Sequence, residues 1–285
     1  MHLVNRRTTI GGAFAVGLSV FLAVPAAHAE TTGAIHVPIG FDAQQSDTRA
    51  NGHLEVVGTG LHIWTDGKTD LGADGRNSDK VAEYVDTNMA LATVGEPYLD
   101  YTDTGADLAD PGFQLVVDLD GGGADGILVG EPGSYGNHWW LAGASPAFSD
   151  SISVPTGDGY AHSAPLNDWR AAFPSARVLA FGFSLGSGVH GDGTIHAINF
   201  ADTRYSFDVV VTSKDGCKDG GWATSTAPVY KNQGECVSHF APSSNSGKGA
   251  GTVMSAGTVT GTGTATAPAA PVVRPPLNSG KIKAI

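Results

Sequence analysis

The sequence predicts an all-β fold, an antiparallel β-sandwich that resembles a jelly roll. Three observations indicate this fold. Short apolar segments alternate with Gly-rich turns across residues 53–212, as in strands joined by tight connections. The last segment alternates strictly between apolar and polar side chains, and almost none of the region has a helical period. About 160 residues are enough for two packed sheets with a real core.

The first 29 residues have the pattern of a secretory signal peptide. Arg6 and Arg7 form a basic start, residues 10–24 are apolar and small, and residues 27–29 give a small-x-small cleavage site. The arginine pair leaves twin-arginine export open as an alternative, although Thr9 stands where a large apolar residue is usual. No second apolar segment of membrane-spanning length follows. We therefore expect secretion, with the product either free or associated with the cell surface.

The charge of the mature chain is strongly negative. Removing the two arginines of the signal from the 16 basic residues leaves 14 against 28 acidic residues, a net charge of −14. Such a surface repels nucleic acid and anionic membranes, and no basic stripe offsets it. We therefore expect neither nucleic acid nor a membrane as the partner.

The elements of the sandwich follow in chain order. Residues 30–52 are mixed in character and are expected to form a lead-in. Strands are expected where a short apolar run ends in a turn, at residues 54–57, 61–64, 113–119, 127–129, 177–183, 194–200 and 204–211. The last two form the clearest hairpin, through residues 201–203. Only residues 166–173 have a helical pattern, which Pro174 ends.

The chain changes character after the sandwich. Residues 213–240 are expected to form a small module tied by Cys217 and Cys236, because an even cysteine pair in an exported protein is most simply a disulfide. A metal site with His239 is the alternative, but it lacks a fourth ligand. The disulfide would close a loop of about 20 residues and stabilise the fold by about 3 kcal/mol. Residues 241–285 are of low complexity and are expected to be disordered.

Two stretches carry a resemblance to a known group of proteins. The first runs from Cys217-Lys218-Asp219-Gly220-Gly221-Trp222 to Lys231-Asn232-Gln233-Gly234-Glu235-Cys236-Val237-Ser238, and the second covers residues 181–207. They resemble the C-terminal module, and the end of the preceding domain, of uncharacterised secreted actinobacterial β-sandwich proteins. The resemblance implies a secreted Gram-positive protein. It implies no catalytic residues.

Trp139 and Trp140, with Tyr135 and His138 beside them, are the predicted ligand-binding residues. Neighbouring residues of a strand point to opposite faces, so one indole can fill the core while the other lies outward and packs against sugar C–H groups. A purely structural role for these aromatics is the alternative. Trp64 and Trp169 are expected in the core.

The acidic turn that contains Asp118, Asp120 and Asp125 is a candidate calcium site, since Ca²⁺ prefers oxygen ligands at this spacing. Two ligand positions of the EF-hand template are missing, at Gly122 and Val129. A solvated turn between two strands explains the same residues, so no firm cofactor is predicted.

Three catalytic hypotheses are weaker. Residues 182–186 match G-x-S-x-G around Ser184, but no helix can start after them, as a nucleophile elbow requires. Residues 121–126 and 186–191 match G-x-G-x-x-G, yet both lead into strands and are turns rather than dinucleotide sites. Lone acids invite a glycosidase interpretation, namely Glu55, Glu83, Glu96, Glu131, Asp118 and Asp120.

The favoured function is therefore a secreted, non-enzymatic binding or surface-associated protein, with an extracellular or cell-wall polysaccharide as its partner. The alternatives are a secreted hydrolase, with Ser184, Asp120 or Glu131 as its weak catalytic candidates, and a purely structural envelope component.

Overall fold

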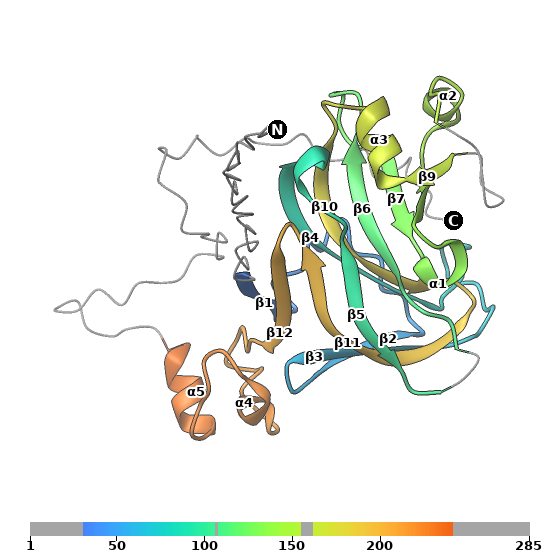
Figure 1. Ribbon diagram of the computed structural model, residues 1–285. Helices are drawn as coiled ribbons and strands as arrows, with labels where there is room; N and C mark the ends of the chain where they lie inside the picture. The colour runs from blue at the N-terminus through green and yellow to red at the C-terminus, as the bar shows by residue number, and fades with distance from the viewer. Residues whose placement is uncertain (1–30, 106–107, 155–161, 242–285) are drawn as a thin grey trace, which may run out of the picture.

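The computed structural model describes residues 31–105, 108–154 and 162–241. The expected signal peptide and low-complexity tail lie outside these residues. Two six-stranded sheets pack face to face in this part of the chain, which confirms the all-β sandwich (Figure 1).

The first sheet has the strand order β1-β12-β11-β3-β2, and β5 also pairs with β11. Its strands are β1 (Thr31–Val37), β2 (Gly52–Val57), β3 (Gly60–Asp66), β5 (Tyr98–Asp103), β11 (His190–Phe200) and β12 (Thr203–Val209).

The second sheet has the order β4-β10-β6-β7-β8-β9, and every neighbouring pair in it is antiparallel. Its strands are β4 (Lys80–Ala90), β6 (Gly112–Asp118), β7 (Gly126–Gly130), β8 (His138–Ala142), β9 (Ser163–Pro165) and β10 (Arg177–Gly186).

The core lies between the inner faces of the two sheets. Its fully buried side chains come from both sheets, among them Leu61, Ile63, Ile195, Leu115 and Phe183. The strand alternation explains this arrangement, because every second residue of a strand faces the opposite sheet. In β12 the predicted alternation is confirmed, since Tyr205 and Phe207 are buried while their neighbours are partly exposed.

The sandwich begins earlier than the sequence indicates. Residues 31–37, expected as a lead-in, form β1 at the edge of the first sheet, where it pairs with β12 in parallel. The expectation of a wholly antiparallel fold is therefore wrong for this one pair. Only Ile35 and Val37 of β1 are buried, so the segment has too few apolar residues to be recognised as a strand.

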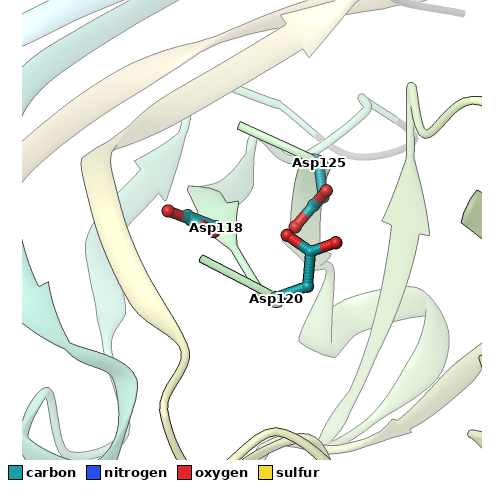
Figure 2. A group of neighbouring side chains, drawn as sticks. All are labelled: Asp118, Asp120 and Asp125. Atoms are coloured by element: carbon teal, nitrogen blue, oxygen red, sulfur yellow. The ribbon is translucent and has the colours of Figure 1, made fainter. Parts of the chain in front are cut away.

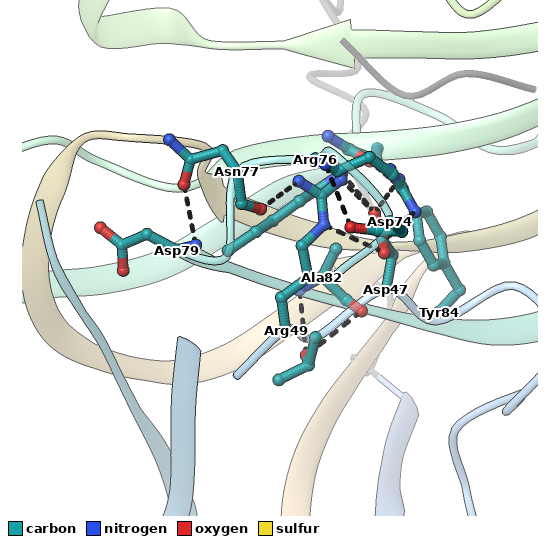
Figure 3. Close-up of polar contacts among 11 residues, drawn as sticks. Asp47, Arg49, Asp74, Arg76, Asn77, Asp79, Ala82 and Tyr84 are labelled. Atoms are coloured by element: carbon teal, nitrogen blue, oxygen red, sulfur yellow. Dashed lines mark hydrogen bonds and ion pairs between the residues drawn. The ribbon is translucent and has the colours of Figure 1, made fainter. Parts of the chain in front are cut away.

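The strand β4 was not expected either, although it pairs along β10 over almost its whole length. Its first residue, Lys80, is buried, and its Nζ lies 3.2 Å from Asp47 Oδ2. Arg49 and Arg76 contact the same oxygen, each at 2.6 Å (Figure 3). Burial raises the pKa of Asp47, but the hydrogen bond from Arg49 and the three positive charges outweigh this effect and hold it below its ordinary value. This network ties residues 47–49 to the second sheet.

Helices are few and short. The predicted helix is confirmed as α3 (Leu166–Ala172), and its Trp169 is fully buried. Five single-turn or two-turn helices were not expected, namely η1 (Leu91–Thr93), α1 (Pro132–Tyr135), α2 (Pro146–Ser149), α4 (Gly221–Thr224) and α5 (Gln233–His239). None of the helices in the described ranges is long and apolar enough to cross a membrane.

The disulfide between Cys217 and Cys236 is present, so the predicted pairing is confirmed. Both cysteines are fully buried in a small core of their own with Val211 and Tyr230. The module lies beside the edge strand β1 and its neighbour β12 (Figure 1). The backbone N–H of Thr226 donates to the carbonyl of Val209 at the end of β12, and this contact fastens the module to the sandwich.

Candidate functional site

A cleft of about 1110 Å³ is lined by residues of both sheets. Residues from four parts of the chain line it. These are β5 with residues 96–97 before it, residues 108–111 with Phe113 at the start of β6, the corner from β7 through α1 into β8, and the end of β10 with Ser187 and Val189 after it. Its size is that of a pocket for a small molecule or part of a polymer. Five aromatic residues line it, namely Tyr98, Tyr101, Phe113, Trp139 and Trp140. Three carboxylates lie among them, those of Glu96, Asp110 and Glu131.

The two neighbouring tryptophans divide as the strand alternation predicts. Trp139 is 5% exposed and meets Phe113 edge to face at a centroid distance of 6.0 Å. Gly130 leaves room for its ring, since a Cβ there would lie 3.0 Å from three of the ring atoms. Trp140 is half-buried on the opposite face of β8, and its Nε1–H donates to Glu131 Oε2 at 3.2 Å. Trp139 therefore builds the wall, and Trp140 offers its surface to the cleft.

Glu131 follows β7 directly and is half-buried beside Trp140. Burial raises the pKa of its carboxyl, and the hydrogen bond from the indole opposes this effect only in part. Gly112 makes space for it, because a Cβ at that position would lie 2.9 Å from Glu131 Cγ. A carboxyl that is held by a ring N–H and has a raised pKa can accept hydrogen bonds or give up a proton.

The other two predicted ligand residues, Tyr135 and His138, are not among the described residues that line the cleft. Tyr135 ends α1 and His138 begins β8, so both lie close to it in the chain. Of the candidate residues discussed so far, the structure thus brings Trp139, Trp140 and Glu131 together in the cleft.

Sequence reasoning did not identify the residues of β5 that line the cleft. Tyr98 is 54% exposed, and the hydroxyl of Tyr101 is buried with no hydrogen-bond partner among the described residues. Burial raises the pKa of Tyr101, and the nearby charges of Asp110, Asp103 and Asp192 add to the effect. The run of aromatic and acidic residues from 98 to 110 was the available signal. Only the pairing of β5 with β11 brings it to the cleft.

Ser184 also lines the cleft, but it is no nucleophile elbow. The whole G-x-S-x-G string lies inside β10, where Ser184 is paired with Ala82 on one side and Gly112 on the other. An elbow requires a sharp turn from a strand into a helix, which exposes the hydroxyl. Asp192 is hydrogen-bonded to His62 at 3.0 Å rather than to His190. The esterase hypothesis therefore loses the geometry it needs.

The acidic turn lies between β6 and β7, at the other end of these strands (Figure 2). Ligand oxygens of Asp118, Asp120 and Asp125 lie within 4.8 Å of one another. One oxygen of each accepts a backbone N–H of the same loop at 2.7 Å, from Gly121, Gly122 and Leu119 respectively. Three carboxylates fall well short of the six to eight oxygens that Ca²⁺ takes. The residues fit a self-bonded turn, and a cation there would need water for most of its ligands.

The glycosidase pair that would combine this turn with Glu131 is excluded by distance. The seven residues of β6 span about 20 Å at the usual rise of a strand, whereas catalytic carboxyl pairs are about 5–10 Å apart. The other single acids have partners elsewhere. Glu83 accepts a hydrogen bond from Thr48 at 2.6 Å, and Glu96 forms an ion pair with Arg170 at 2.8 Å.

Trp64, expected in the core, is half-exposed on the outer face of the first sheet. It stacks with His53 and His62 at centroid distances of 4.9 and 4.6 Å. The expectation is wrong because β3 alternates, so Leu61 and Ile63 take the core side instead. His62 lies between Glu55 and Asp192, at 3.2 and 3.0 Å. Burial lowers its pKa, but these hydrogen bonds outweigh burial and raise it.

Neither a family model, nor a curated protein, nor a solved structure matches this chain, so its function has to be inferred from the cleft itself.

Proposed function

We propose that this is a secreted, non-enzymatic protein that binds polysaccharide in the cleft between β5 and the β7–β8 corner. One observation carries the proposal: the half-buried Trp140, with its indole N–H held by Glu131, presents its surface to a cleft that Tyr98 and Tyr101 also line. Sugar rings have apolar C–H faces that pack on aromatic rings, and hydroxyl groups that bond to carboxylates. The cleft supplies both kinds of partner.

The charge of the protein narrows the ligand to neutral or amino-sugar polymers. The carboxylates of the cleft belong to a protein whose net charge is −14 without the two arginines of the signal, so an anionic polymer would be repelled. The disulfide and the N-terminal pattern support a location outside the cytoplasm. The resemblance to secreted actinobacterial proteins points the same way and stays a prediction.

The proposal is tested by affinity electrophoresis of the secreted protein in gels that contain laminarin, xylan, mannan or glycol chitin, the last of which is an amino-sugar polymer. We expect at least one of these polymers to retard the protein, and Trp140→Ala to weaken the retardation about tenfold or more, since the stacking surface is lost. Trp222→Ala is the matched control, because Trp222 packs in the disulfide module instead of the cleft. Retardation by none of the four polymers, or equal retardation of Trp140→Ala, would contradict the proposal.

A glycosidase is the second candidate, and a specific observation favours it. Burial raises the pKa of Glu131, as in a general acid, and Asp110 lines the same cleft. In that case Glu131→Gln would still be retarded by the polymer, but reducing sugar would no longer be released from it. Wild-type protein that binds the polymer and releases no sugar would exclude this candidate.

A further inference from the structure

A second cavity, of about 560 Å³, adjoins the cleft. Its walls are residues 94–98, which lead into β5, and residues 199–203, which form the turn between β11 and β12. Glu96 and Tyr98 line both the cavity and the cleft, so the two hollows meet at these side chains. Tyr98, which is 54% exposed, therefore belongs to both hollows.

Asn199 in the second cavity is the unusual residue. It is 7% exposed, and neither its Oδ1 nor its Nδ2 has a hydrogen-bond partner among the described residues. Its neighbour in the β-ladder on one side, Arg204, is bound to Asp100 at 2.6 Å. Its neighbour on the other side is Tyr98. Buried polar groups are nearly always paired, and an unpaired one destabilises the fold.

A leucine at this position would fill a similar volume without the destabilisation that an unpaired polar group causes. The contacts of the described residues therefore give no structural reason for an amide here. The amide lies buried at the wall of the cavity, and it has both donors and an acceptor with which a ligand group that reaches it could pair. The charged side chains that line this cavity, Glu96 and Asp202, are acidic, and Glu96 is already paired with Arg170. The site therefore fits a neutral group rich in hydroxyls rather than an anion.

We propose that the Asn199 cavity is a second subsite for the same polysaccharide, so that one linear chain runs from Trp140 across Tyr98 to Asn199. The inference rests on the proposed function, and it adds that the bound part of the polysaccharide is linear. It requires an unbranched segment long enough to occupy both hollows, with a hydroxyl or acetamido group bonded to the Asn199 amide. Tyr98 supports the sugar that joins the two subsites.

The binding experiment measures affinity by calorimetry for oligosaccharides of two to six units prepared from each of the four polymers. Wild-type protein is expected to bind more tightly as the chain lengthens. Asn199→Leu is expected to weaken binding of the longest oligosaccharide about fivefold or more and to leave the shortest unchanged. Tyr98→Ala, at an exposed position, should also reduce the increase in affinity with oligosaccharide length. If affinity does not rise with length, or if Asn199→Leu weakens all lengths equally or none, the inference is overturned.

A stability measurement tests the Asn199 side chain without any ligand. Asn199→Leu is expected to unfold at the same temperature as wild type or a higher one. Asn51→Leu is the matched control and should unfold at a lower temperature, because the Asn51 amide donates to Ser78 Oγ at 2.7 Å. A lower unfolding temperature for Asn199→Leu would show a structural amide and overturn the inference.

The two proposals fail in different ways. If no polymer retards the protein, the proposed function fails and takes the second subsite with it. If a polymer retards the protein and Trp140→Ala abolishes this, while Asn199→Leu binds all lengths as wild type does, only the second subsite fails.

Discussion

The hairpin of β6 and β7 has two ends that contrast sharply, although the same two strands build both. At the turn end, three aspartates each accept a backbone N–H from their own loop. At the other end, Glu131 is held by the indole of Trp140 in a cleft where the Tyr101 hydroxyl has no partner among the described residues. Acidic residues that their own loop already bonds need no ligand. The end where a polar group lacks a partner among the described residues is therefore the better candidate for function.

The largest expected effect lies at the cleft end. Trp139→Ala should lower the free energy of unfolding by about 3–5 kcal/mol, because a nearly fully buried aromatic ring is removed from the core. Chemical denaturation measures this. Trp140→Ala should cost much less, since its ring is only half-buried. Equal losses for the two variants would contradict the division of the indoles between wall and surface.

At the turn end, Asp125→Ala should lower the free energy of unfolding by about 1 kcal/mol, because the backbone N–H of Leu119 loses its acceptor. Asp120→Ala is the matched control, at an exposed position, and should change stability by less than about 0.5 kcal/mol. Thermal unfolding of the two variants side by side would show this. A larger loss of stability for Asp120→Ala than for Asp125→Ala would mean that Asp120 stabilises the turn by more than its hydrogen bond to Gly122.

The pH dependence of stability should include a contribution from Glu131. Burial raises its pKa above the ordinary value of 4.5, so the folded protein holds this proton more tightly than the unfolded chain. Stability must then fall as the pH rises from below 4.5 through the raised pKa. Glu131→Gln should remove that fall, which denaturant unfolding between low and neutral pH would detect. An unchanged profile would mean that the carboxyl is not desolvated.

The smallest expected effect is that of calcium. With three carboxylates, each bonded to its own loop, the turn should bind Ca²⁺ with a dissociation constant of about 1 mM or weaker. A calcium concentration equal to that constant adds only about 0.4 kcal/mol, or about 1–2 °C in the unfolding temperature. A clearly larger shift that Asp120→Asn abolishes would make the turn a true calcium site and reverse the comparison of the two ends.

Much of the fold was predictable because its signals are local. Alternation along residues 204–208 predicts a half-buried strand, and the adjacent indoles of Trp139 and Trp140 must point to opposite faces of any strand. The two cysteines have only each other as a covalent partner. The strand β4 was missed because its buried Lys80 looks like a surface residue. Only the distant Asp47, Arg49 and Arg76 show why the position tolerates a charge.

The sequence by itself determined the all-β class, the disulfide and the tryptophan pair, because each depends on residues close in the chain or on a pairing without alternatives. Tertiary structure alone decided the site. Tyr98 and Tyr101 line the same cleft as Trp140 only because β5 pairs with β11, a strand about 90 residues further along. The unpaired amide of Asn199 is likewise a property of its surroundings, since whether a polar group finds a partner among the described residues depends on every element packed around it.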